Sequence, residues 1–250
     1  MAALLMAVLM ACSPQDEAAE TTPETIAPTQ ANATGEARKP TLLLVSSLPI
    51  LFGPGLPTGA EFSIEKVQDG SESALRAVLE QRFDLLGIAA TGPEELAKGE
   101  LLLMAHPRAQ TAEHLVALDE WVRAGGKVLL LADPAFAVEM GPPTLGGDYP
   151  PPYFADTGLL GHWGVLLDGP LSYGAAQLEL AGETVTVRSP GRFEVVGENC
   201  TLEADGFLAD CALGEGRALI LADADFVIEK GEAGRANLAA LKGLLERLAG

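Results

Sequence analysis

Basic residues, aromatic residues and cysteines are all scarce in this sequence of 250 residues. Sixteen Lys and Arg stand against 35 Asp and Glu, which gives a formal net charge of −19 at pH 7. A surface of that sign repels the phosphates of nucleic acids, so we expect no nucleic-acid partner. Hydrophobic residues still make up 48% of the chain, enough for the core of one α/β domain with some decoration.

The short motifs of common catalytic and metal sites are also missing. No Gly-x-Ser-x-Gly turn, HExxH, CxxC or EF-hand spacing occurs, and the glycine-rich residues 53–59 lack the Gly-Lys-Ser/Thr ending of a phosphate loop. An amidotransferase nucleophile needs a cysteine on a turn from a buried strand into a helix, and neither Cys200 nor Cys211 has that setting. Ser46 and Ser47 are the only hydroxyl groups at the exit of a predicted strand. We therefore expect no catalytic residue and no cofactor.

No apolar run approaches the ~20 residues that a membrane-spanning helix needs. Residues 1–11 are nevertheless an unbroken apolar segment of the length found in secretory signals. The segment ends in Leu-Met-Ala before Cys12, which resembles the bacterial lipobox, although it contains no Lys or Arg. We expect residues 1–11 to be a lipoprotein signal peptide and Cys12 to carry the lipid. The alternative is a tail in which this cysteine has no role.

The composition changes after Cys12. Residues 12–40 are rich in Ala, Thr, Glu and Pro, and Ile26 is their only large aliphatic residue. Such a segment cannot offset its ordering entropy by burial, so we expect a disordered tether. The folded domain is then predicted to occupy residues 41–250.

An even pair of cysteines, Cys200 and Cys211, remains in that domain. Asp205-Gly206, near the middle of the segment between them, is typical of a hairpin turn, so the two cysteines can face each other across paired strands. We expect a disulfide in an oxidising compartment. The alternative is two free buried thiols.

One stretch occurs twice. Residues 126–136 and 216–226 both lead from a glycine and one cation through an apolar run to Ala-Asp and a phenylalanine. An apolar run without polar alternation predicts a strand buried on both faces of a parallel sheet. Asp133 and Asp223 then stand at the carboxyl ends of core strands, where open α/β sheets usually bind ligands. The second copy adds Asp225 where the first has Ala135.

The candidate binding edge consists of side chains that follow predicted strands. Its members are Ser46, His106, Asp133, Asp223 and Asp225. Their oxygens suit Mg²⁺ or Ca²⁺, but aspartates in this position more often cap helices or accept hydrogen bonds in turns. We therefore predict no metal.

Further elements complete an α/β pattern. Strands are predicted at residues 41–45, 83–90 and 101–105, and helices at residues 72–83, 111–125 and 237–249. Thr111 is the predicted N-cap of the second helix. An insertion at about residues 137–213 contains residues that alternate as in strands, which predicts a small antiparallel β-extension at one edge of the sheet.

Residues 101–133 carry a family resemblance. A strand leads through a capped helix with Leu118-Asp119-Glu120-Trp121-Val122 to a Gly-Gly-Lys strand that ends in Asp133-Pro134. This arrangement resembles the auxiliary domain of gliding-motility-type ABC transport systems and the related DUF4350 proteins. The resemblance spans about residues 41–250. It implies a class I glutamine-amidotransferase-like sheet and a non-catalytic role beside a membrane transporter. Those auxiliaries carry transmembrane helices, which a lipid on Cys12 would replace here.

The sequence thus predicts a flavodoxin-like or glutamine-amidotransferase-like fold, with a doubly wound, mostly parallel sheet and a small antiparallel β-extension. The predicted function is that of a lipid-anchored accessory or binding protein on the periplasmic side of a bacterial cell envelope, with ABC transporter subunits as partners. The alternative is a hydrolase or metal-dependent enzyme of the same fold.

Overall fold

The computed structural model describes residues 39–48, 74–137 and 149–250. Several predictions concern residues outside these ranges: the signal peptide, Cys12, most of the tether, the glycine-rich residues 53–59, and part of the insertion. The start of the first predicted helix, at residue 72, also lies outside them. Within the described ranges, no helix combines the length and the apolar character needed to cross a membrane.

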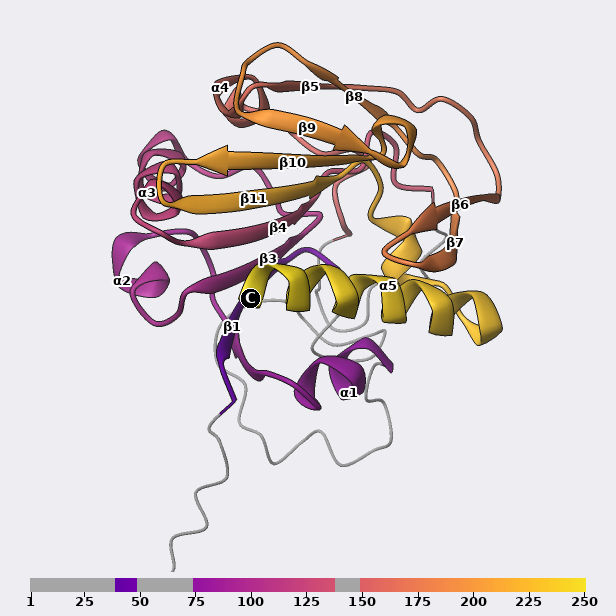
Figure 1. Cartoon of the computed structure of the whole chain (residues 1–250), viewed down its shortest axis with the longest axis horizontal. Helices are drawn as coiled ribbons and strands as arrows, with labels where there is room; N and C mark the ends of the chain where they lie inside the picture. The colour runs from indigo at the N-terminus through magenta and orange to yellow at the C-terminus, as the bar shows by residue number, and fades with distance from the viewer. Residues whose placement is uncertain (1–38, 49–73, 138–148) are drawn as a thin grey trace, which may run out of the picture. The chain divides into compact units, whose positions relative to one another are not determined.

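A mixed sheet of seven strands forms the centre of the domain. Its strands, in spatial order, are β2 (Asp84–Gly87), β1 (Thr41–Ser46), β3 (Leu101–Ala105), β4 (Lys127–Leu131), β11 (Gly216–Leu221), β10 (Leu208–Leu213) and β9 (Cys200–Glu203) (Figure 1). The first five are parallel to one another, and β10 runs antiparallel to both of its neighbours. The prediction of a mostly parallel α/β sheet is confirmed at this level.

The two repeated stretches are neighbours in this sheet. β4 and β11 pair in parallel register from Lys127 opposite Arg217 to Leu131 opposite Leu221. All residues of β3, and all but the first of β4, are buried, because these apolar strands are covered on both faces. The register places the ends of β4 and β11 side by side, so the Ala-Asp pairs that follow them also become neighbours.

Five α-helices within the described ranges accompany the sheet. They are α1 (Ala74–Glu80), α2 (Pro93–Leu96), α3 (Ala112–Arg123), α4 (Leu159–Trp163) and α5 (Gly231–Ala249), with 3-10 segments η2 (Ala204–Gly206) and η3 (Asp225–Ile228). α1 contacts α5, and α2 contacts α3 (Figure 1). Thr111 is the N-cap of α3 as predicted, and its hydroxyl accepts a hydrogen bond from His114 N at 3.4 Å. α5 begins at Gly231 instead of Asn237, and Gly234 fits its first turn because a Cβ there would clash with the carbonyl oxygen of Glu229.

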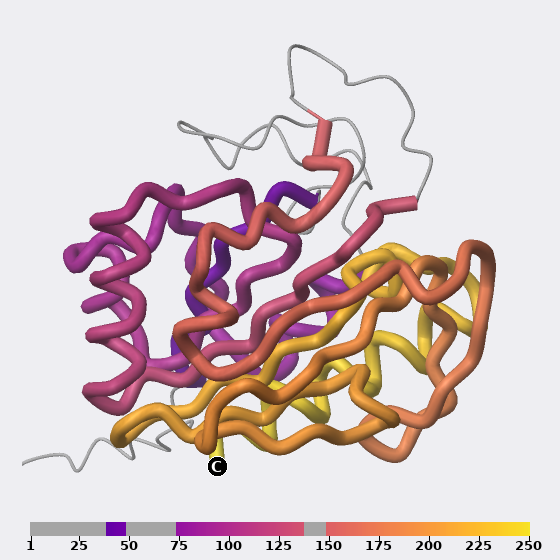
Figure 2. Tube along the Cα trace, turned by 90° about the horizontal axis from the view of Figure 1, so that it is seen from above, coloured from indigo at the N-terminus to yellow at the C-terminus, as the bar shows by residue number. Residues whose placement is uncertain are grey.

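The insertion differs from the single β-extension that the sequence predicts. Only β9 and β10 extend the main sheet, while β5 (Val165–Asp168) pairs with β8 (Arg192–Val195) and β6 (Ala176–Leu180) pairs with β7 (Glu183–Val187) in two separate small sheets. The β6–β7 hairpin packs on the C-terminal helix, and Figure 2 shows this orange segment lying against the yellow one.

Asn237 of α5 explains where the β6–β7 hairpin sits. Its side-chain Oδ1 accepts a hydrogen bond from Thr186 N, and its Nδ2 donates to the carbonyl oxygens of Thr186 and Phe226, each at 2.8 Å. The amide therefore bonds β7 as a neighbouring strand would. This bonding holds the hairpin against the helix.

The leading glycines of the repeated stretches permit close packing at the end of α3. A Cβ atom on Gly126 would lie closer than 3.0 Å to the ring of Trp121. A Cβ on Gly216 would lie closer than 3.0 Å to the main-chain oxygens of Val122 and Gly126. Neither contact is possible for a real side chain, so β11 can begin beside the C-terminus of α3 only with glycine at position 216.

Cys200 and Cys211 are joined by a disulfide in the structure. They stand directly opposite each other on the antiparallel strands β9 and β10, with Cα atoms 4.0 Å apart. Between these strands the chain turns through Asp205 and Gly206, which have φ angles of 53° and 88°. Asp and Gly tolerate this left-handed conformation, in agreement with the predicted hairpin turn.

Removing this disulfide is expected to destabilise the protein by about 2 kcal/mol, the lower end of the usual range, because the closed loop is short. The measurement is urea unfolding of the wild type and of the double variant Cys200→Ser, Cys211→Ser. Wild type treated with a reductant is the control, since it loses the bond without a change of side chain. Equal unfolding midpoints for all three samples would show that the bond adds no stability.

Candidate functional site

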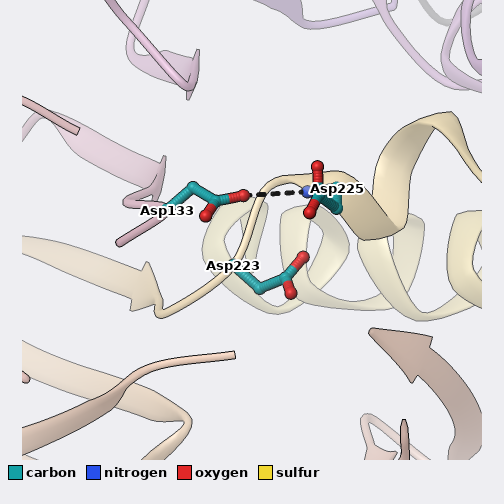
Figure 3. A group of neighbouring side chains, drawn as sticks. All are labelled: Asp133, Asp223 and Asp225. Atoms are coloured by element: carbon teal, nitrogen blue, oxygen red, sulfur yellow. Dashed lines mark hydrogen bonds between the residues drawn. The ribbon is translucent and has the colours of Figure 1, made fainter. Parts of the chain in front are cut away.

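The carboxyl edge of the sheet brings three aspartates together. Asp133 follows β4, Asp223 follows β11, and Asp225 begins η3. One carboxylate oxygen from each residue lies within 4.8 Å of those from the other two (Figure 3). All three residues have no exposed surface. We call these residues the carboxylate cluster.

Asp133 is bound mainly by main-chain amides. Its Oδ1 accepts a hydrogen bond from Ala135 N at 2.8 Å, which closes the turn predicted at this position. Its Oδ2 accepts from Ala224 N at 3.0 Å and from Asp225 N at 3.3 Å (Figure 3). Asp133 therefore also connects the end of β4 to the segment that follows β11, a link that local capping does not provide.

Asp223 caps the segment that follows it. Its Oδ1 accepts a hydrogen bond from Phe226 N at 3.0 Å, and its Oδ2 accepts from Arg188 N at 3.4 Å. The first bond satisfies an amide in the first turn of η3, as expected for an aspartate before a helical turn. Asp133 and Asp223 thus both accept nearby main-chain hydrogen bonds, together with longer-range bonds.

Asp225 is the least satisfied member of the cluster. Its Oδ2 accepts hydrogen bonds from Ala137 N at 3.1 Å and from Ser189 Oγ at 3.0 Å. Its Oδ1 is buried and has no hydrogen-bond partner among the described residues. A buried oxygen without a donor is rare in native proteins and requires an explanation.

His106 lies near this cluster and is also fully buried. Its Nε2 lies 2.7 Å from the carbonyl oxygen of Pro151, and its ring stacks on Phe136 with centroids 5.1 Å apart. Because a carbonyl can only accept, Nε2 carries the proton and Nδ1 presents a lone pair. Within the described part of the chain, Nδ1 has no hydrogen-bond partner.

The serines of the candidate edge bond to main chain next to His106. Ser46 Oγ donates to Ala105 O at 3.0 Å and accepts from Leu48 N at 2.9 Å. Ser47 Oγ donates to the carbonyl oxygen of His106. Neither hydroxyl makes a hydrogen bond to a histidine ring or a cluster carboxylate among the described residues, so Ser46 is not part of the cluster.

Burial dominates the electrostatics of the cluster. It raises the pKa of Asp133, and burial followed by the charges of Asp133 and Asp225 raises the pKa of Asp223 well above its usual value. Burial and then the charge of Asp133 raise the pKa of Asp225 to about 6. Burial also lowers the pKa of His106, which favours the neutral ring.

Mutual repulsion of the carboxylates adds to the cost of burial. Two ionised carboxylates separated by 4.8 Å repel each other by roughly 3 kcal/mol at an effective dielectric constant near 20. The ion pairs between described residues include none made by the three cluster aspartates. Arg188, which forms an ion pair with Glu229, also interacts with the charges of Asp223 and Asp225. Protons or a cation reduce the negative charge that remains.

Sequence reasoning missed Ser189 as a cluster neighbour. Besides Asp225, its buried hydroxyl contacts the carbonyl oxygen of Ala135, so it connects the segments that follow β4 and β11. Ser189 comes from the insertion between β7 and β8, and no motif surrounds it. A single serine in an irregular segment gives no signal by which its position could be predicted.

The cluster does not open to solvent, since all its members are fully buried. A hollow of about 10 Å³ lies elsewhere, lined by residues that include Met104, Pro107, Leu115 and Phe154. Its volume is close to that of a single water, so it is too small for an organic substrate.

Comparisons with known proteins show the fold alone. No protein-family profile and no curated protein sequence matches the chain. The cytoplasmic protein STM1381 from Salmonella typhimurium LT2 is similar in structure, with a TM-score of 0.51 and 12% identity over 83% of this chain and 99% of that one. The mmIFT52 N-terminal domain has a TM-score of 0.50 and 13% identity over 82% of this chain and 96% of that domain.

A third similar structure belongs to a much longer protein. The GH42 β-galactosidase Gan42B has a TM-score of 0.47 and 13% identity, with 84% of this chain covered. The match covers 30% of that galactosidase.

Proposed function

We propose that this protein is a non-catalytic, extracytoplasmic accessory or binding protein held at a membrane by a lipid on Cys12. The observation that carries the proposal is the disulfide between Cys200 and Cys211. Disulfides form and persist in oxidising compartments such as the periplasm and are rare in the cytosol. An oxidising compartment agrees with the interpretation of residues 1–11 as an export signal and of Cys12 as the lipid-bearing residue.

The bonding and burial of the side chains at the candidate edge support a non-catalytic role. The disulfide occupies both cysteines of the folded domain, so neither can supply an attacking thiolate. Asp133 and Asp223 accept main-chain hydrogen bonds through both of their oxygens, and all three cluster carboxylates are buried. A general acid or base must contact the reacting group with which it exchanges a proton. A fully buried carboxylate makes no such contact with a substrate from solvent.

The strand order supports a finer fold assignment. The parallel part of the sheet runs β2-β1-β3-β4-β11, which is the 2-1-3-4-5 order of flavodoxin-like folds when β11 is counted as the fifth strand. We assign the domain to this flavodoxin-like or amidotransferase-like group, with β10 and β9 added at one edge. Ser46, Ser47 and His106 then lie where the strand order reverses, between β1 and β3.

Transporter subunits are the partners in this proposal, on the basis of the resemblance of residues 101–133 to ABC transport auxiliaries and DUF4350 proteins. The second candidate function is that of a metal-dependent enzyme of the same fold. It is favoured by one observation, the convergence of the three cluster aspartates within 4.8 Å. Complete burial of those residues makes it the weaker candidate.

Purification of the full chain from detergent-solubilised bacterial membranes tests the proposed function. We expect mass spectrometry to find a mature N-terminus at Cys12 carrying diacylglycerol, and membrane transporter subunits in the same eluate. Cys12→Ala is the control, and we expect it to lack the diacylglycerol and to be held at the membrane only through the partner. An N-terminal peptide that begins at Met1 with a free thiol contradicts the anchor, and recovery of the lipidated protein alone contradicts the partner.

A further inference from the structure

Two buried electron-pair donors at the carboxyl edge of the sheet lack a hydrogen-bond partner among the described residues. Asp225 Oδ1 belongs to the carboxylate cluster, and His106 Nδ1 belongs to the residue that follows β3, the strand next to β4. Both residues have no exposed surface. Unpartnered acceptors at this depth are uncommon, and the one within the cluster, Asp225 Oδ1, indicates that the site is completed by a group that accepts electron pairs.

The separation of the carboxylates matches the reach of a single ion. One oxygen from each of Asp133, Asp223 and Asp225 lies within 4.8 Å of the other two, and Figure 3 shows the carboxylates of Asp223 and Asp225 turned toward each other. Calcium binds oxygens at about 2.3–2.6 Å, so two oxygens on opposite sides of one ion are roughly 4.6–5.2 Å apart. The three oxygens therefore meet the separation that ligands of one ion require.

From this geometry we infer that Asp133, Asp223 and Asp225 bind one hard divalent cation, for which Ca²⁺ is the first probe. All the ligand atoms are carboxylate oxygens, which suit Ca²⁺, Mg²⁺ or Mn²⁺ better than softer metals. The amides that hold Asp133 and Asp223 keep their carboxylates oriented, and the cation neutralises charge that no ion pair among the described residues offsets. The inference does not depend on the proposed membrane role.

A shared proton is the competing explanation. A proton can bridge two carboxylate oxygens, but only at hydrogen-bond distance and along one line. One shared proton therefore satisfies one pair, and the third carboxylate needs a proton of its own. A cation contacts three oxygens at once without a directional requirement, so it accounts better for a cluster of three.

Titration of the chelator-treated full chain with CaCl₂ tests the inference. We expect saturable binding of one Ca²⁺ per chain by isothermal titration calorimetry and a rise in melting temperature. Parallel titrations with MgCl₂ and MnCl₂ identify the preferred ion. Absence of saturable binding for all three ions, or a melting temperature that they leave unchanged, overturns the inference in favour of shared protons.

Asp225→Asn and Asp223→Asn locate the site. Each variant removes one negative charge and retains the shape of the side chain, and we expect each to weaken Ca²⁺ binding at least tenfold. Asp168→Asn is the matched control, because it removes the same charge from an exposed position on β5. Binding that all three variants preserve, or weaken equally, shows ions held by the acidic surface and contradicts the inference.

A measurement on the wild type covers the case in which the cluster variants fail to fold. Eu³⁺ is a luminescent substitute for Ca²⁺, and its lifetimes in H₂O and D₂O report the waters that remain on the ion. We expect bound Eu³⁺ to retain clearly fewer waters than free Eu³⁺, because the carboxylates are buried. A bound ion that keeps nearly all of its waters lies on the surface, which excludes the cluster as its site.

Discussion

Alanine at position 216 is expected to destabilise the protein by about 3 kcal/mol or more, at the upper end for overpacking substitutions. The added Cβ would lie closer than 3.0 Å to the main-chain oxygens of Val122 and Gly126. Main-chain atoms at the end of α3 cannot rotate aside as a flexible side chain can. β11 or α3 must therefore shift, which disturbs the pairing of β11 with β4.

Gly243→Ala is the matched control for this substitution. Gly243 lies within α5, and a Cβ there would meet Ala181 at 3.7 Å, an ordinary contact distance. We expect a gain of about 0.5–1 kcal/mol, because alanine favours the helix more than glycine does. Urea unfolding monitored by circular dichroism measures both variants. Loss of less than 1 kcal/mol from Gly216→Ala would show that the start of β11 adapts more easily than the structure indicates.

The second large effect is the pH dependence that Asp225 confers in the absence of divalent cations. Burial and the charge of Asp133 raise its pKa from 3.8 to about 6 in the folded protein. Between these values the folded state keeps a proton that the unfolded state has released. Its contribution to stability is therefore complete below pH 3.8 and is lost as the pH rises through about 6. The shift corresponds to a loss of about 3 kcal/mol.

Other groups titrate in the same range, so the comparison must be with a variant. His106, whose pKa is lowered by burial, acts in the opposite direction and favours folding as the pH rises. Asp223, whose pKa is raised well above its usual value mainly by burial, acts in the same direction as Asp225. Subtracting the free energy of unfolding of Asp225→Asn from that of the wild type at each pH removes most of their contribution.

Chemical unfolding in EDTA from pH 4 to pH 7.5 provides that difference. We expect the wild type to lose stability relative to Asp225→Asn by about 2.5 kcal/mol over this pH range, while Asp168→Asn follows the wild type. A difference that is independent of pH would mean that Asp225 is ionised throughout and that its neighbours stabilise its charge. A difference that grows with pH in the opposite direction would contradict the assigned environment.

Much of the sheet follows from the sequence, because its strands are apolar without alternation. The repeated stretches predict two core strands, and the structure pairs them in register as β4 and β11. The cap at Thr111 and the stop after Arg123 are local signals, so α3 is also predictable. The order of the seven strands and the separation of β5–β8 and β6–β7 from the main sheet depend on long-range contacts that no local pattern encodes.

Part of the candidate site was also predictable, because its aspartates follow apolar strands. Asp133, Asp223 and Asp225 follow two buried strands, and the parallel pairing of those strands is sufficient to bring them to one edge. Their burial is not predictable, because it depends on the insertion and on side chains such as Ser189. Ser46 follows a different strand and makes its hydrogen bonds with main chain beside β3.

Asn237 couples parts of the chain that are far apart in sequence. Its amide group is fully buried and bonds Thr186 in the β6–β7 hairpin and Phe226 in η3 from within α5. If α5 detached, the hairpin would lose the bonds to Thr186 and expose buried polar groups at once. The C-terminal helix and the β6–β7 hairpin therefore form one cooperative unit, in which amide hydrogens should exchange with solvent together during local opening.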